Sequence, residues 1–88
     1  MWIADGRDDS IAQISSSTNR VVRRVRVGNR PTALAVGEGS VWVANVDDGT
    51  VSRIDPKQGT VVATIRVGPN PTHVAAGEGG VWVTVRPT

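Results

Sequence analysis

The side chain best suited to proton transfer is His73, the single histidine of the chain. Imidazole is the group most often used in general acid–base catalysis, but it needs a positioned partner and usually an electrophilic stabiliser or a metal. The chain has no second histidine to share this work, and it has no cysteine that could act as a nucleophile. We therefore predict that the protein has no catalytic residue and is not an enzyme.

Two pairs of neighbouring aspartates, Asp8-Asp9 and Asp47-Asp48, are the residues most able to attract a cation. Calcium needs six to eight oxygen ligands, and neither pair has the acidic spacing of an EF-hand loop. Aspartate is also a common turn residue. We expect both pairs to form turns, and we predict no metal site and no cofactor.

Four arginines fall within seven residues and resemble a phosphate-contacting patch: Arg20, Arg23, Arg24 and Arg26. On a strand, alternation places Arg23 on one face and the other three on the opposite face. No aromatic residue lies among them to stack on bases, and ten basic against eight acidic residues give a net charge of only +2. We predict a solvated strand edge and no nucleic-acid partner.

The apolar runs of the chain are too short for a membrane span, so no membrane partner is predicted. The first nine residues lack the charged and apolar regions of a signal peptide. The cellular compartment is left open. Cysteine is absent, so neither disulfides nor a thiolate zinc site can stabilise the fold.

Elements that would position these side chains become visible when the chain is compared with itself at an offset of 40 residues, where it matches without a gap. Three tryptophans recur at this period, which suggests packing between repeated units. Matching segments include Trp2, Trp42 and Trp82; Asp8 and Asp48; 26–28 and 66–68; 31–32 and 71–72; 37–39 and 77–79; 41–43 and 81–83.

Each repeat consists of short β-branched runs separated by Gly, Pro, Asn and Asp, a pattern typical of strands and turns. The predicted strands of the complete repeat are 32–36, 41–46, 50–55 and 60–67. Gly49 supplies the positive φ that the hairpin turn after Asp47-Asp48 requires. Four antiparallel strands in 40 residues are typical of one β-propeller blade.

The repeat resembles the YVTN-type β-propeller repeat of bacterial and archaeal surface-layer and periplasmic proteins, which is related to the repeats of streptogramin lyases. The matching residues are 41–45, 49–56, 59–65, 67–68 and Pro71. The resemblance covers the whole chain and implies a fold rather than an activity. Streptogramin lyases use a histidine near a comparable channel entrance, so the resemblance implies a lyase-like role for His73. This is the least favoured of the functions considered.

We therefore predict an all-β fold of propeller blades with four antiparallel strands each. Residues 1–88 form a single segment of two blades, with blade strands in 1–27, 32–67 and 72–88. Two blades leave flat apolar sides uncovered, so we expect homo-oligomerisation to complete the ring. Three chains would give six blades and four chains would give eight, with a strand exchanged between neighbours. Residues 81–83 then compete with residues 2–4 for one strand position.

The expected function is self-assembly by a structural segment, either designed or taken from a longer repeat protein. An alternative is a fragment that aggregates, exchanges strands in a dimer, or folds only within a longer protein. A second class of function is a ligand-binding module at the channel face, where polar side chains of the loops would gather. The candidate ligand-binding residues are Asn29, Arg30, Asn45, Asp48, Asn70 and His73.

Overall fold

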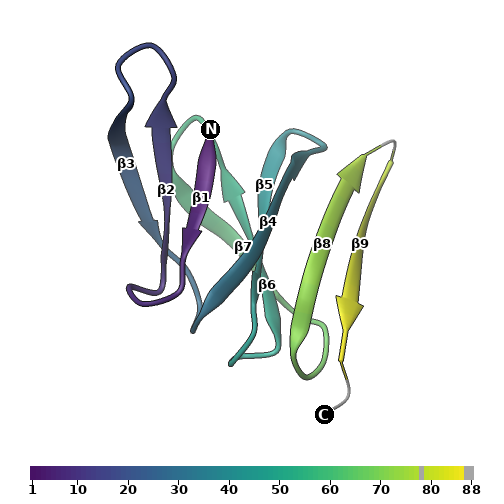
Figure 1. The fold of residues 1–88 in the computed structure, drawn as a ribbon. Coiled ribbons are helices and arrows are strands. Elements are labelled where there is room, and N and C mark those ends of the chain that lie inside the picture. Colours follow the sequence, from purple (N-terminus) through teal and green to yellow (C-terminus); the bar gives the residue numbers. More distant parts are fainter. Residues whose placement is uncertain (78, 87–88) are drawn as a thin grey trace.

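The computed structural model describes residues 1–77 and 79–86 of the chain. These residues form nine strands and no helix (Figure 1). The strands are β1 (Trp2–Asp5), β2 (Ser10–Ser15), β3 (Arg20–Arg26), β4 (Pro31–Gly37), β5 (Ser40–Asn45), β6 (Thr50–Asp55), β7 (Thr60–Arg66), β8 (Pro71–Gly77) and β9 (Gly80–Val85). Pro87 and Thr88, at the end of the predicted segment 72–88, lie outside the described residues. No helix in the described part could cross a membrane.

The strands are joined into three antiparallel sheets, so the predicted all-β class is confirmed. We call β1-β2-β3 the first sheet, β4-β5-β6-β7 the central sheet and β8-β9 the last sheet. Strands of the central sheet match the predicted ranges to within one residue at each end. Gly49 has a φ of 67° in the β5–β6 turn, as predicted.

The backbone follows the 40-residue period of the sequence. Trp2 lies opposite Gln13 in the first sheet, and Trp42 lies opposite Arg53 in the central sheet. A register shift interrupts β2 between Gln13 and Ile14, and another interrupts β6 at the equivalent place. By this correspondence, β1, β5 and β9 occupy the same position in successive sheets, and so do β4 and β8.

The main core lies between the first and central sheets. It is built from buried apolar side chains of both sheets, with Trp2, Ala4, Val27 and Leu34 packed around them. These buried residues are Ile11 and Val25 on the first sheet and Val41, Val43 and Ile54 on the central sheet. Strand alternation explains why these residues are buried, because every second residue of a strand points to the same neighbouring sheet.

On its other face, the central sheet packs against the last sheet through β4 and β8, which lie side by side in Figure 1. Trp42 faces this side and is only 9% exposed. Its indole Nε1 donates to the carbonyl oxygen of Gly37 at 3.0 Å. The guanidinium of Arg53 lies 5.1 Å from the ring centroid, within cation–π distance.

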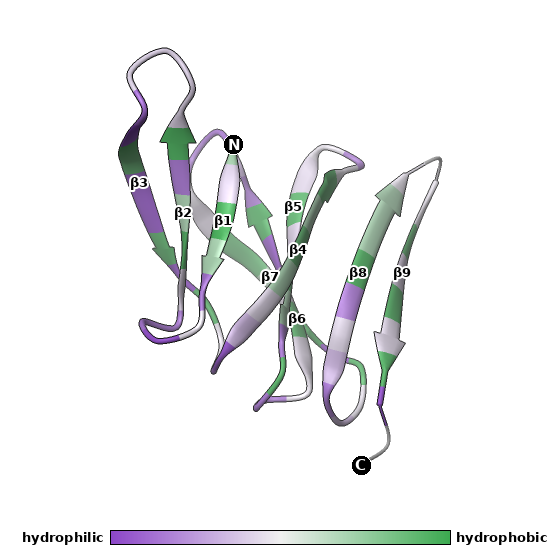
Figure 2. Ribbon diagram, in the orientation of Figure 1, coloured by the Kyte–Doolittle hydropathy of each residue, from purple (hydrophilic) through white to green (hydrophobic). Residues whose placement is uncertain are grey.

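Several large apolar side chains remain exposed on the outer strands and on the last sheet. Trp82 on β9 is 63% exposed, in contrast to its equivalent Trp42. Figure 2 shows hydrophobic residues along β8 and β9, and an alternation of hydrophilic and hydrophobic residues along β3. The molecule measures 40 × 31 × 19 Å. It is a flat stack of sheets with apolar surface on its outer sides.

Candidate functional site

The candidate ligand-binding residues lie at one end of the strands, on the connections that join the sheets. Asn29 and Arg30 belong to the β3–β4 connection, Asp48 to the β5–β6 turn and Asn70 to the β7–β8 connection. Asn45 ends β5, and His73 is the third residue of β8. The antiparallel topology brings these segments to the same end of the molecule (Figure 1).

Asp48 is held by the β3–β4 connection. Its Oδ2 accepts a hydrogen bond from the backbone N–H of Asn29 at 2.9 Å, and its Oδ1 accepts one from the Asn29 side-chain amide at 2.8 Å. These two bonds, the backbone one first, lower the pKa of Asp48 below its ordinary value of 3.8 because they stabilise the carboxylate. Asp48 therefore links two loops and remains ionised at neutral pH.

Asn45 is fully buried, so its side chain faces the interior of the sheet rather than a channel. Its amide nitrogen donates to Thr50 Oγ1 at 3.1 Å and to Ser52 Oγ at 2.9 Å. Its Oδ1 is buried without a partner among the described residues. Gly28 lies directly over it, since a Cβ at Gly28 would be 2.8 Å from Asn45 Cγ and 2.6 Å from Asp48 Oδ2.

Arg30 connects three loops through its backbone and its guanidinium. The backbone N–H donates to Asp9 Oδ1 at 2.9 Å, and the side chain lies 3.9 Å from Asp47 Oδ1. Both side chains of the ion pair are more than half exposed, so the pair contributes little to stability. The aspartates lie in turns, as predicted, in the segments 6–9 and 46–49. Asp9, Asp47 and Asp48 also contact the β3–β4 connection.

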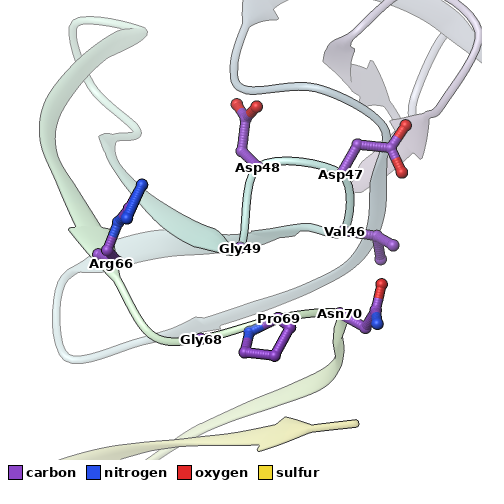
Figure 3. Close-up of a pocket in the computed structure, with 8 residues that line it drawn as sticks. All are labelled: Val46, Asp47, Asp48, Gly49, Arg66, Gly68, Pro69 and Asn70. Atoms are coloured by element: carbon purple, nitrogen blue, oxygen red, sulfur yellow. The ribbon is translucent and has the colours of Figure 1, made fainter. Parts of the chain in front are cut away.

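Asn70 lines a shallow hollow of about 460 Å³ between the β5–β6 turn and the β7–β8 connection. Figure 3 shows Asp47 and Asp48 on one side of this hollow and Pro69 and Asn70 on the other. The hollow is lined by Val46, Asp47, Asp48, Gly49, Arg66, Gly68, Pro69 and Asn70. It carries two carboxylates, one guanidinium and one amide. This set is suited to a small molecule that has both a positive and a negative group.

Arg66 also lines this hollow, but it was not predicted as a ligand-binding residue. It ends β7, and its equivalent 40 residues earlier is Arg26. Arg66 lies near the β5–β6 turn because it is opposite Thr50 in the β6–β7 ladder, and beside it Val67 N–H donates to Gly49 O at 3.0 Å. The repeat period alone does not indicate which side chains line one hollow, so the proximity of Arg66 and Asp48 was not foreseen.

His73 lies apart from this hollow and is exposed. Its Nδ1 lies 3.3 Å from the hydroxyl of the adjacent Thr72. Over residues 1–77 and 79–86, no group of three or more His, Asp or Glu side chains is arranged to hold a metal ion. The structure thus brings Asp48 and Asn70 together at the hollow, buries Asn45, and leaves His73 on the surface.

The arginines of β3 separate as alternation predicts. Arg23 reaches the central sheet and donates to the carbonyl oxygens of Pro56 at 3.0 Å and Lys57 at 3.4 Å. Arg24 turns to the opposite face, where its guanidinium lies 3.7 Å from Asp5 and 4.0 Å from Asp8. Two of the four arginines are therefore engaged within the protein, on opposite faces.

No protein-family model and no curated protein matches the sequence. Among solved structures, the chain is similar to hydrazine synthase of Kuenenia stuttgartiensis, with a TM-score of 0.91 and 24% identity, over 96% of this chain and 25% of that chain. It is also similar to the glutaminyl cyclase of Myxococcus xanthus, with a TM-score of 0.67 and 19% identity, over 92% of this chain and 44% of that chain.

Both of these proteins contain a β-propeller, so the likeness supports a propeller-like all-β fold. The chain spans a quarter of the hydrazine synthase chain and less than half of the cyclase chain. At these identities the likeness concerns the fold alone.

Proposed function

We propose that this chain is a structural, self-assembling segment of a β-propeller without catalytic activity. In this proposal each four-stranded sheet is one blade, and copies of the chain join into a closed ring. The observation that carries the proposal is the contrast between two equivalent tryptophans. Trp42 is 9% exposed under the last sheet, whereas Trp82 is 63% exposed on a sheet face that no described residue covers.

The two outer sheets are complementary parts of one blade. The first sheet corresponds to β5-β6-β7 of the central sheet, and the last sheet corresponds to β4-β5. A first sheet therefore has no equivalent of β4, and a last sheet has no equivalents of β6 and β7, within the described residues. Joining the last sheet of one copy to the first sheet of another supplies all four strand positions.

Such a contact is head-to-tail, because different surfaces of the two copies meet, and it closes only if the rotation per copy divides a full turn. Propellers close with about four to eight blades. Two blades per chain therefore favour a homotrimer with six blades or a homotetramer with eight. We further propose that the blades are YVTN-type repeats, which the 40-residue period and the motif residues around Val41–Asn45 support.

The test is the particle mass in solution, measured by light scattering and native mass spectrometry. We expect three or four times the chain mass of 9.3 kDa. A cooperatively melting particle of one chain mass would contradict self-assembly. Trp82→Arg should reduce the assembled fraction, because it places a charge on the face to be buried. Gln58→Arg adds the same charge at the exposed tip of the β6–β7 turn and should leave the mass unchanged.

A second candidate function is a ligand-binding module, favoured by the hollow that Asp48, Arg66 and Asn70 share. Its mixed charge suits a small zwitterion. Titration with free amino acids, followed by the NMR signals of Asp48, Gly49 and Arg66, tests this candidate. Shifts confined to these amides and lost in Arg66→Ala would support binding, and unchanged spectra at millimolar concentration would exclude it.

A further inference from the structure

Two strands of the chain compete for the same place in the joined blade, and the structure favours one of them. We infer that β9 of one copy displaces β1 of the next, so that the composite sheet runs β8-β9 from one copy and β2-β3 from the other. This inference rests on the proposed self-assembly. It specifies which surfaces of two copies meet: the free edge of β9 and the edge of β2 that β1 now covers.

The competing strands carry different residues at a position that becomes buried. In the central sheet this position is Asn45, which is fully buried. The equivalent residue is Asp5 in β1 and Val85 in β9. The choice between the two strands therefore decides whether a carboxylate or an isopropyl group is enclosed in the joined blade.

The loop that covers this position already fits β9. In the central sheet, Gly28 of the β3–β4 connection lies over Asn45. Its equivalent Gly68, in the β7–β8 connection, lies over Val85, and a Cβ at Gly68 would be 3.3 Å from Val85 Cγ1. Retaining the β8-β9 hairpin preserves this contact. Replacing β9 by β1 would place Asp5 under Gly68 instead.

Asp5 has little to satisfy it in that enclosed position. Its Oδ1 now accepts a bond from the backbone N–H of Arg7 at 3.2 Å, and its Oδ2 lies 3.7 Å from exposed Arg24. Where Asn45 meets the hydroxyls of Thr50 and Ser52, Asp5 faces Ser10 and Ala12. Burying a carboxylate without a full set of donors is costly, whereas burying Val85 is favourable.

The β8-β9 hairpin is also the more extensively paired of the two. Six residue pairs join β8 to β9, and four join β1 to β2. Both pairings extend by two further bonds: Arg86 N–H donates to Asn70 O at 3.0 Å and the Asn70 amide to Arg86 O at 3.3 Å, while Ile14 N–H donates to Met1 O at 2.7 Å and the N-terminal amine of Met1 to Ile14 O at 3.2 Å. The difference therefore lies in the ladder pairs. Opening β1 from β2 gives up fewer paired residues than opening β9 from β8.

Trp82 completes the argument, because the exchange moves it into a core that already accepts a tryptophan. Trp2 packs against the core between the first and central sheets. Trp82 is equivalent to Trp2, so β9 in the place of β1 brings Trp82 to the same surface of the neighbouring copy. The exchange buries the indole of Trp82 and releases that of Trp2, so the core accepts either strand and the preference for β9 comes from Val85 in the place of Asp5.

Disulfide trapping in the assembled full-length chain tests this exchange, and the natural sequence helps because it has no cysteine. Ile3 lies opposite Ala12 in the first sheet, and Val83 takes the place of Ile3 if β9 enters. Ala12→Cys with Val83→Cys should cross-link different copies. Ile3→Cys with Ala12→Cys should cross-link within one copy only if β1 stays. Ala12→Cys with Thr84→Cys is the matched control, because Thr84 points to the other face of β9.

On mild oxidation of assembled protein, we expect the Ala12–Val83 pair to give intermolecular cross-links at least about tenfold above the Ala12–Thr84 control, as face alternation requires. The Ile3–Ala12 pair should react little in the assembled fraction. If Ile3–Ala12 closes within each copy while Ala12–Val83 remains at the control level, β1 is retained; the inference is then wrong although self-assembly stands. If the natural chain and all of these variants have the mass of a single chain in solution, self-assembly is contradicted, and the inference with it.

Discussion

The two contacts between sheets differ in how many strands take part. Between the first and central sheets, β2 and β3 contribute Ile11 and Val25, and the core they share with Ile54 is fully enclosed. The last sheet has only two strands in the described residues, of which β8 packs against β4 and β5, and Ile65 on β7 stays 43% exposed. The difference teaches that burial in this fold depends on the outer strands of each sheet as much as on the inner ones.

The tryptophan pair tests this comparison with the largest expected effect. Trp42→Ala should lower the free energy of unfolding by about 3–5 kcal/mol, because it empties an enclosed aromatic site. Trp82→Ala should lower it only at protein concentrations where copies join, since its side chain is exposed in the single chain. Urea unfolding followed by circular dichroism, at two concentrations about a hundredfold apart, separates the two. Equal losses at both concentrations for Trp82→Ala would contradict the comparison.

A smaller effect is expected at the loop that closes over Asn45. Gly28→Ala places a methyl group 2.6 Å from Asp48 Oδ2 and 2.8 Å from Asn45 Cγ, so the β3–β4 connection must shift. We expect a loss of about 1–3 kcal/mol in the free energy of unfolding, as for overpacked sites. Gly77→Ala, where nothing lies within 4 Å of the new methyl group, is the control and should be close to neutral. Thermal and urea unfolding measure both.

The smallest effect is expected in the pH dependence of stability, through Asp48 in the β5–β6 turn of the four-stranded central sheet. Its folded pKa lies below 3.8, so its bonds to Asn29 stabilise the folded state above that pH. This contribution is lost as the pH falls through the folded pKa, because protonation then removes the charge that the bonds favour.

Asp48→Asn should therefore show a shallower fall of stability below pH 4 than the natural chain. In Asn29→Ala, the pKa of Asp48 should move part of the way back toward 3.8, because the side-chain bond is lost and the backbone bond remains. NMR titration of the Asp48 carboxyl carbon measures this shift. An unchanged pKa in Asn29→Ala would show that the side-chain bond does not contribute to the shift.

Most of the fold could be predicted because strand and turn residues act locally. The β-branched runs and the Gly and Asp turns define β4 to β7 to within one residue. The register shift near Ile54 was not predicted, because a bulge depends on how two strands meet rather than on one strand's composition.

The candidate site was harder to predict, because the offset of 40 residues shows which positions are equivalent but not which side chains meet across loops. Asp48 and Asn29 were both foreseen at this end, yet their bond to each other depends on the crossing of the β3–β4 connection. Asn45 was predicted as a channel residue, and its burial under Gly28 follows from close backbone packing that the sequence does not display. For Arg66, the only indication in the sequence was its positive charge, which does not place it beside the hollow.

The recurring contact between a connection and the sheet that follows it has a consequence for how such a protein can grow. Val46 N–H donates to Arg30 O at 3.1 Å, and its equivalent Arg86 N–H donates to Asn70 O at 3.0 Å, so both steps from one sheet to the next are made in the same way. A duplicated 40-residue unit inserted after Gly68 would find matching neighbours before and behind it. Tandem duplication of the 40-residue repeat therefore requires no change in existing surfaces. A gene that encodes two blades could in this way come to encode a closed ring of blades in one chain.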